Sequence, residues 1–354
     1  MNWLLLFIPV AIALEHFAPD RHLAIFVASG LAILPLAAWM GRATEQIAGR
    51  LGEGVGGLLN ATFGNAAELI IALTALREGL YDVVKASIAG SIVGNILLVL
   101  GAAMVAGGLR HREQTFNAQG ARAQATMMTL AAITLILPAA YQAALGKEAG
   151  PGLVSLSVSI SVVLLIVYAL FLAFSLVTHS SLFSGSPAAE HDSTPHWSIA
   201  RSATVLATST VFVAWMSEIL VGSIQPAARS LGLGSAFVGV FVVAILGNAA
   251  EHATAVTVAM KNRMDLALSI AIGSSVQVAL FVAPVLVLAS LVLGPTPMDL
   301  ALPAGLVLTV LLAVLITGQV AADGRSDWLK GMQLLAAYVV LGLTFFFMPA
   351  ILTR

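Results

Sequence analysis

The chain has 354 residues, of which 59% are hydrophobic and only 9% are charged, and its formal net charge is −1. A soluble globular domain carries about 25% charged residues because water must solvate its surface, so this composition excludes a soluble fold and predicts a surface that faces lipid. The near-zero net charge and the lack of a basic stripe argue against nucleic acid as a partner. The absence of cysteine excludes disulfides, thiolate metal sites and cysteine nucleophiles.

Apolar runs long enough to cross a bilayer follow one another along the whole chain. A helix needs about 20 apolar residues to span the hydrocarbon layer. The sequence predicts eleven such spans, at residues 3–18, 22–41, 55–77, 83–108, 122–143, 150–178, 198–222, 235–260, 264–293, 299–320 and 329–349. We interpret the first as an uncleaved helix rather than a signal peptide, because no Lys or Arg precedes its apolar run. The predicted fold class is therefore an all-α, polytopic membrane protein.

Two connections between the predicted spans are long. One is the basic loop 108–121, and the other, residues 179–197, has the composition of a solvated linker and lies near the middle of the chain. When the connections alternate between the two sides, ten lysines and arginines fall on the side of the N-terminus and six on the other side. This excess favours a cytoplasmic N-terminus under the positive-inside rule.

A pentapeptide in the third predicted span, Gly64-Asn65-Ala66-Ala67-Glu68, recurs 183 residues later as Gly247-Asn248-Ala249-Ala250-Glu251. The match continues at the same offset over about two spans, where Val55-Gly56 matches Val238-Gly239 and Gly90-Ser91 matches Gly273-Ser274. Chance would not keep an acid, an Asn and a Gly-Ser pair in one register. We infer an internal duplication.

The duplication divides the chain into two halves. The predicted organisation is an extra N-terminal helix at 1–20, a first five-helix repeat at 21–178, the linker at 179–197 and a second five-helix repeat at 198–354. An odd number of spans per repeat inverts the second repeat in the membrane, so the two Glu-bearing helices are expected to run antiparallel. Inverted repeats with a site near the midplane are typical of secondary transporters that work by alternating access.

Glu68 and Glu251 fall inside predicted spans, at equivalent positions of the two repeats. A carboxylate near the bilayer centre costs at least about 2.5 kcal/mol on insertion scales, so it must face a cavity, a partner or an ion. Two carboxylates in one apolar site cannot both ionise without compensation, which either protons or a cation can supply. The sequence therefore predicts a site that holds a cation and protons in turn.

The polar groups expected around the two acids are mostly oxygen ligands. They come from the side chains of Asn65, Asn248, Asn95, Gln277, Ser91 and Ser274. Gly64 and Gly247 predict a helix break before each acid, which would free backbone carbonyls. About six to eight oxygens in a pliable cage suit Ca²⁺ better than Mg²⁺. A soft metal is disfavoured because the chain has no thiolate to offer and His252 is the nearest imidazole. Ca²⁺ is the predicted transported substrate, with Mn²⁺ or another divalent cation as an alternative, and no cofactor is predicted.

These paired motifs resemble those of the Ca²⁺/H⁺ antiporters, the CAX branch of the Ca²⁺/cation antiporter superfamily. The likeness rests on Gly64 to Glu68 and Gly247 to His252, and it continues through Gly90-Ser91, Gly94-Asn95, Gly273-Ser274 and Gln277. The resemblance covers the second predicted span to the last. It implies that Glu68 and Glu251 bind Ca²⁺ and protons in turn, with the Asn, Ser and Gln residues lining the pathway.

Two features distinguish this chain from other members of the superfamily. Sodium-coupled relatives typically have Pro before the motif acid, where this chain has Ala67 and Ala250. The family often carries a strongly acidic segment between the halves, whereas this linker offers only Glu190 and Asp192. The resemblance therefore favours proton coupling, without an acidic calcium-sensing segment.

Other readings of the sequence remain as alternatives. The chain has no His-Glu-x-x-His, Gly-x-Ser-x-Gly or ATP-binding motif, so we expect a transporter driven by an ion gradient and not an enzyme. A Na⁺-coupled or other divalent-cation exchanger is one alternative, and a passive cation channel is another. His252 either titrates in proton coupling or only packs beside Glu251. For Glu218, in the seventh span, a structural role is favoured over a proton shuttle.

The expected partners are Ca²⁺, H⁺ and the lipid bilayer, and a homo-oligomer is compatible with the sequence. The compact loops favour a bacterial inner membrane over an organellar one.

Overall fold

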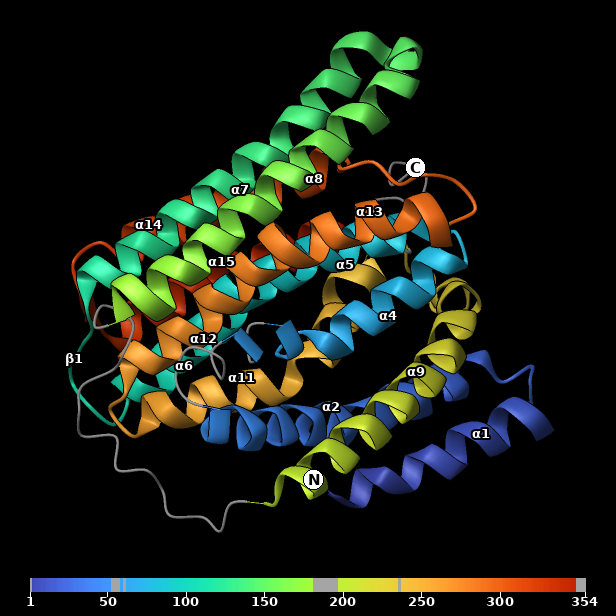
Figure 1. Cartoon of the computed structure of the whole chain (residues 1–354), viewed down its shortest axis with the longest axis horizontal. Helices are drawn as coiled ribbons and strands as arrows, with labels where there is room; N and C mark the ends of the chain where they lie inside the picture. The colour runs from blue at the N-terminus through green and yellow to red at the C-terminus, as the bar shows by residue number, and fades with distance from the viewer. Residues whose placement is uncertain (1, 52–57, 60–61, 181–196, 235–236, 348–354) are drawn as a thin grey trace.

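The computed structural model describes residues 2–51, 58–59, 62–180, 197–234 and 237–347, and it is nearly all helical (Figure 1). In chain order the elements are η1 (Asn2–Leu6), α1 (Phe7–Phe17), α2 (His22–Leu51), α4 (Ala66–Arg77), α5 (Tyr81–Val93), η2 (Gly94–Val99), α6 (Leu100–Gly108), β1 (Gln114–Thr115), α7 (Ala118–Leu145), η3 (Gly146–Ala149), α8 (Gly150–Ala173), η4 (Phe174–Thr178), α9 (Ile199–Ser230), η6 (Val238–Val243), α11 (Ala244–Met260), α12 (Met264–Gln277), η7 (Val278–Val282), α13 (Ala283–Leu293), α14 (Ala304–Val320), β2 (Arg325–Ser326) and α15 (Trp328–Phe347).

The predicted membrane class is confirmed in its coarse form. Within the described residues, seven helices are long and apolar enough to span a membrane, or eight if the bent pair Val238–Ala249 and Glu251–Met260 counts as one span. Two shorter apolar helices, Asn2–Phe17 and Ala304–Val320, add to them. The count of eleven stays a prediction, and most of the predicted linker lies outside the described residues.

The helices form layers around a buried centre (Figure 1). Most of the continuous helix from α5 through η2 to α6 is buried, and it lies against α11, α12 and α15. The antiparallel pair α7 and α8 projects beyond the bundle on one side, and α1, α2 and α9 form a separate layer on the other. The outer faces of α8 and α15 expose large apolar side chains, such as Leu170 and Phe347. Such faces suit contact with lipid.

Two helices are longer than their hydropathy predicts. The expected second and seventh spans ended at residues 41 and 222, whereas α2 continues to Leu51 and α9 to Ser230. The two helices pack along each other, and Trp197, two residues before α9 begins, donates its backbone N–H to Gln46 Oε1 at 2.9 Å. Packing against a neighbouring helix thus extends α2 past the point where its apolar composition ends.

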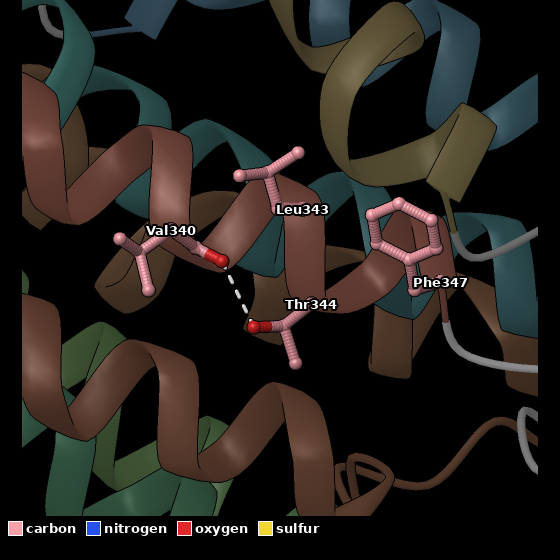
Figure 2. Close-up of a pocket in the computed structure, with 4 residues that line it drawn as sticks. All are labelled: Val340, Leu343, Thr344 and Phe347. Atoms are coloured by element: carbon pink, nitrogen blue, oxygen red, sulfur yellow. Dashed lines mark hydrogen bonds between the residues drawn. The ribbon is translucent and has the colours of Figure 1, made fainter.

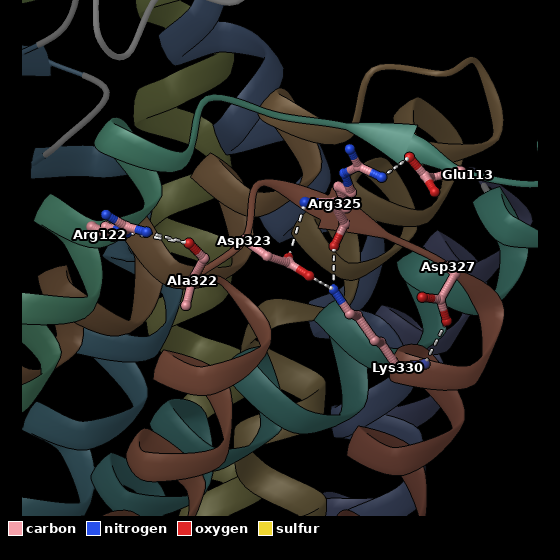
Figure 3. A network of polar contacts seen from close by, with 7 residues as sticks. All are labelled: Glu113, Arg122, Ala322, Asp323, Arg325, Asp327 and Lys330. Carbon is pink, nitrogen blue, oxygen red and sulfur yellow. Dashed lines mark hydrogen bonds and ion pairs between the residues drawn. The ribbon is translucent and has the colours of Figure 1, made fainter.

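Short strands join two loops at one end of the bundle. β1 pairs antiparallel with β2, a feature that helical periodicity could not predict. The loop before β1 contributes Glu113, which pairs with Arg325 at 3.3 Å, and α7 contributes Arg122, which donates to Ala322 O at 2.7 Å (Figure 3). These contacts join segments that lie about 200 residues apart in the sequence.

Lys330 at the start of α15 completes this network. It donates to Asp323 Oδ2 at 2.6 Å and to Arg325 O at 2.8 Å (Figure 3). The hydrogen bond from Lys330 holds the pKa of the Asp323 carboxyl below its usual range. A charge-assisted contact of this kind stiffens the turn between α14 and α15.

A second set of polar contacts lies at the other end of the helix that runs from α5 to α6. Lys85 Nζ donates to Asp299 Oδ1 at 2.7 Å and to Ala301 O at 2.9 Å, and Tyr81 donates its O–H to Thr296 O at 2.5 Å. Both ends of this buried helix are therefore bonded to loops from the second half of the chain.

A surface hollow on α15 is lined by Val340, Leu343, Thr344 and Phe347 (Figure 2). Thr344 Oγ1 donates to Val340 O at 2.8 Å, so its hydroxyl is already bonded within the helix. These four side chains carry no titratable group, and the buried acids lie elsewhere.

Gly90 allows a close crossing between α5 and η6. A Cβ atom at this position would overlap the backbone of Val240, whereas a Cβ atom at Gly94, one turn later, would meet nothing within 4 Å. We expect Gly90→Ala to destabilise the detergent-purified protein by about 1–3 kcal/mol through overpacking. Its thermal unfolding temperature should fall, while that of Gly94→Ala should stay near the wild-type value. Equal unfolding temperatures for the two variants would contradict this crossing.

Candidate functional site

Glu68 lies in the first turn of α4, directly after a turn that interrupts the helix. Residues 62–63 are helical, Gly64 and Asn65 form a turn, and α4 begins at Ala66. The predicted break at this glycine is therefore confirmed. The positive end of the helix dipole lies at the start of α4, where it favours a carboxylate. Only 7% of Glu68 is exposed, so its carboxylate is largely withdrawn from bulk solvent.

The second motif folds differently from the prediction. The chain does not unwind at Gly247 and Asn248; α11 continues through both, and a bend of 66° separates Val238–Ala249 from Glu251–Met260. One reason is local, because Asn248 Nδ2 bonds Ala244 O at 3.1 Å within the helix. Gly247 also packs closely against α4, since a Cβ atom at this position would lie 2.6 Å from Glu68 Cγ. Gly247 thus gives Glu68 room beside α11.

Three elements meet at the Glu68 carboxylate. Ser91 from α5 donates its O–H to Glu68 Oε1 at 2.8 Å. Asn248 from α11 donates Nδ2–H to the same oxygen, and Nδ2 also lies 3.3 Å from Ser91 Oγ. A carboxylate in an apolar interior is stabilised by such donors. The contact joins the first motif to the second, as the duplication predicts.

A related arrangement surrounds Glu251. Ser274 from α12 donates to Asn65 Oδ1 at 3.0 Å and also lies within hydrogen-bonding reach of the Glu251 carboxylate. Each acid is thus approached by a serine from the following helix, and each serine lies beside an asparagine of the other motif. Gln277 is buried at the end of α12, three residues after Ser274 and hence near its face of the helix.

His252 Nε2 lies 3.1 Å from Asn95 Oδ1, in the π-helical segment η2. The ring is partly buried and points towards η2 from the residue next to Glu251. This contact joins α11 to η2 at the residue that follows Glu251.

Several buried polar atoms at this site have no hydrogen-bond partner among the described residues: Asn65 Nδ2, Glu68 Oε2, Asn95 Nδ2 and Glu251 Oε2. An unsatisfied buried polar atom is costly and calls for an explanation, such as an ion or water that binds there. The charge of Glu251 acts on Glu68, so the two carboxylates lie close enough to influence each other. The two free carboxylate oxygens therefore offer a place for a cation or for protons.

The described residues contain no group of three or more His, Cys, Asp or Glu side chains that could hold a metal ion. A cation at this site would accordingly bind the two carboxylates and neutral oxygens. Hard cations such as Ca²⁺ accept ligands of this kind.

Glu45 is a residue that the sequence analysis missed. It lies on α2, and its charge acts on Glu251. Glu45 lies only four residues beyond the predicted end of the second span, and its position next to that span could have pointed to it. It was left out because the span was defined by apolar residues alone. Glu218, in contrast, forms an exposed ion pair with Arg77 at 3.2 Å, as its structural reading predicts.

Comparison with known proteins gives matches along nearly the whole chain. The family described as sodium/calcium exchanger protein matches residues 21–177 and 201–347. The chain is 48% identical to the Ca(2+)/H(+) antiporter of Aphanothece halophytica, over 98% of this chain and 96% of that protein. It is 42% identical to the Ca(2+)/H(+) antiporter ChaA of Bacillus subtilis, over 91% of this chain and 92% of that protein. The solved structure of native YfkE superposes with a TM-score of 0.82 at 38% identity, covering 96% of this chain and 97% of that one.

Proposed function

The chain belongs to the sodium/calcium exchanger protein family, and we propose that it is a secondary active antiporter that exchanges Ca²⁺ for H⁺. The observation that carries this proposal is the pair of carboxylates of Glu68 and Glu251, each with a buried oxygen that has no hydrogen-bond partner among the described residues. Relatives that are 48% and 42% identical bear the name Ca(2+)/H(+) antiporter, which supports this choice of ions. Membership of this family indicates transport rather than catalysis.

The two carboxylates would bind Ca²⁺ and protons in turn. When both are ionised, their repulsion and lost hydration must be compensated, and a divalent cation between them does so. When the cation leaves, protons on Glu68 and Glu251 remove the same conflict. Because one pair of groups serves both ions, either ion must leave before the other binds, and this competition couples the two flows.

The neighbouring polar residues are assigned to the pathway. Ser91 and Asn248 hold one oxygen of Glu68 and so orient the other towards the cation. Ser274 and Asn65 have the related role beside Glu251. Asn95, Gln277 and His252 are proposed to line the route. Gly64 is proposed to permit the turn before α4, and Gly247 to leave room for the Glu68 side chain.

Alternating access would come from two inverted five-helix repeats. The family matches the chain twice, over residues 21–177 and 201–347, which supports a division close to the predicted repeats at 21–178 and 198–354. The paired Glu–Ser contacts in each half support it too. The site between the repeats would then open to one side of the membrane at a time. Eleven spans, with one extra N-terminal helix at 1–20, complete this proposed organisation.

The proposed setting is a bacterial inner membrane, where proton entry would drive Ca²⁺ export. The bilayer is the constant partner, and a homo-oligomer is compatible with the apolar outer faces of α8 and α15. A sodium-coupled exchanger is the alternative that the transport experiment must distinguish.

Replacing either acid tests the paired site. We expect Glu68→Gln and Glu251→Gln each to reduce proton-driven uptake of radiolabelled Ca²⁺ into proteoliposomes to background, because one remaining carboxylate cannot alternate between the two ions. Wild-type uptake should follow the imposed pH gradient and not a Na⁺ gradient. Coupled uptake retained in either variant would reject the paired site, and uptake without any gradient would indicate a channel.

The space beside Gly247 gives a second test. Gly247→Ala places a Cβ atom against Glu68 Cγ and should displace the carboxylate, lowering kcat/KM for Ca²⁺ by about tenfold or more. Gly222→Ala is the matched control, because a Cβ atom there meets nothing within 4 Å. Both variants should remain folded, as measured by size-exclusion chromatography. Wild-type transport by Gly247→Ala would show that the position of Glu68 is not critical.

A further inference from the structure

One acid within a membrane-spanning helix has no role in the exchange described above. Glu45 lies on α2 within the apolar span His22–Arg50, and it is exposed at the molecular surface. Within the described part of the chain, no hydrogen bond or ion pair holds its carboxylate. An ionised side chain inside a span requires water, a cation or an opposite charge beside it. Glu45 therefore marks a place where the span is not surrounded by lipid alone.

Glu45 lies between one membrane face and Glu251. Helices α2 and α11 pack against each other and run towards the same end of the bundle (Figure 1). From Glu45, α2 continues to Leu51, a rise of about 9 Å, whereas α11 continues from Glu251 to Met260, a rise of about 14 Å. The charge of Glu45 acts on Glu251 across this contact.

Polar side chains continue along α11 beyond Glu251. Thr254 and Thr257 follow Glu251 at intervals of three residues, so the three lie on neighbouring turns. Both threonines are exposed, and Glu251 itself is partly exposed, whereas Glu68 is buried. We call Glu45, Glu251, Thr254 and Thr257 the α2–α11 seam. Glu45 and the two exposed threonines thus lie between the face where α2 and α11 end and Glu251, whose Oε2 atom is buried.

We propose that Glu45 is a cation-collecting residue of the α2–α11 seam, which holds Ca²⁺ transiently at this face and delivers it to Glu251. This inference rests on the proposed function and adds a step to it. A fixed negative charge in a partly enclosed polar path raises the local concentration of a cation and its association rate. A carboxylate that no described residue holds can also release the ion readily, as a transient site must.

The competing explanation is that Arg42, one turn earlier in α2, simply neutralises Glu45. The charge of Arg42 does act on Glu45, but no ion pair joins them in the described residues. The two explanations predict different effects of removing Arg42 on the affinity for Ca²⁺. If Glu45 collects cations, removal of Arg42 strengthens the attraction for Ca²⁺; if Glu45 only balances Arg42, removal of either residue disturbs the same structural pair.

Water access can be measured directly because the chain contains no cysteine. Glu45→Cys and Thr254→Cys should react with a membrane-impermeant thiol reagent added at the face where α2 and α11 end. Ile166→Cys, an exposed apolar position within α8, should not react from either side. Ca²⁺ should slow the labelling of Thr254→Cys, and Glu45→Gln in the same chain should weaken that protection. An unreactive Glu45→Cys would overturn the proposal.

Sided transport then tests the role of the charge. With Ca²⁺ presented at this face, Glu45→Gln should raise the KM by about fivefold with kcat retained, and Arg42→Gln should lower it. With Ca²⁺ at the opposite face, neither variant should change the KM. The matched control is Glu218→Gln, an acid on α9 already paired with Arg77, which should keep the wild-type KM at both faces.

A KM that rises equally at both faces, or an equal rise in Glu218→Gln, would show a general effect of charge or structure and overturn the proposal. Failure of the wild type to exchange Ca²⁺ for H⁺ would overturn the proposed function, and the role of Glu45 in Ca²⁺ delivery with it. The cysteine labelling distinguishes this case, because it reports water access in the seam without depending on transport.

Discussion

Two acidic side chains in an apolar interior impose a constraint that the surrounding structure must meet. Glu68 and Glu251 lie close enough for the charge of one to act on the other, and neither can ionise without compensation. The protein provides only part of that compensation. It bonds one oxygen of Glu68 through Ser91 and Asn248, and within the described residues nothing bonds the second oxygen. A carboxylate oxygen without a protein partner suits the reversible binding of an ion, which is what the proposed exchange requires.

The contacts around these acids connect helices that lie far apart in the sequence. Glu68 on α4 is bonded by Asn248 on α11, and Ser274 on α12 is bonded to Asn65 at the start of α4. Gly247 allows this close approach because it has no side chain beside Glu68. A change in the occupancy of one acid would therefore reach contacts in both halves of the chain, which is the physical basis of the coupling that we propose.

Polar contacts at the ends of the bundle add rigidity around the site. The buried helix from α5 to α6 is bonded at its start through Lys85 and Asp299, and the loop at its far end is bonded through β1 and β2. Charged contacts that are partly withdrawn from water hold their geometry better than exposed ones. Helices α2 and α9 lie in a separate layer, so the seam that carries Glu45 is formed where that layer meets α11.

The sequence alone determined the membrane class, the two acids and the resemblance to a family of antiporters. Hydropathy and the cost of a buried charge are properties of single residues and short windows, and a repeated motif is visible without any fold. Features that depend on contacts outside such windows could not be predicted in this way. Hydropathy did not point to Glu45, because the apolar run stops near residue 41, whereas α2 continues to Leu51 with α9 packed along it. Likewise, the helix of the second motif, α11, was expected to unwind at Gly247, but it bends between Ala249 and Glu251. Only the tertiary structure decided these features, together with which serine and asparagine bond each acid, because they depend on pairs of residues brought together from distant parts of the chain.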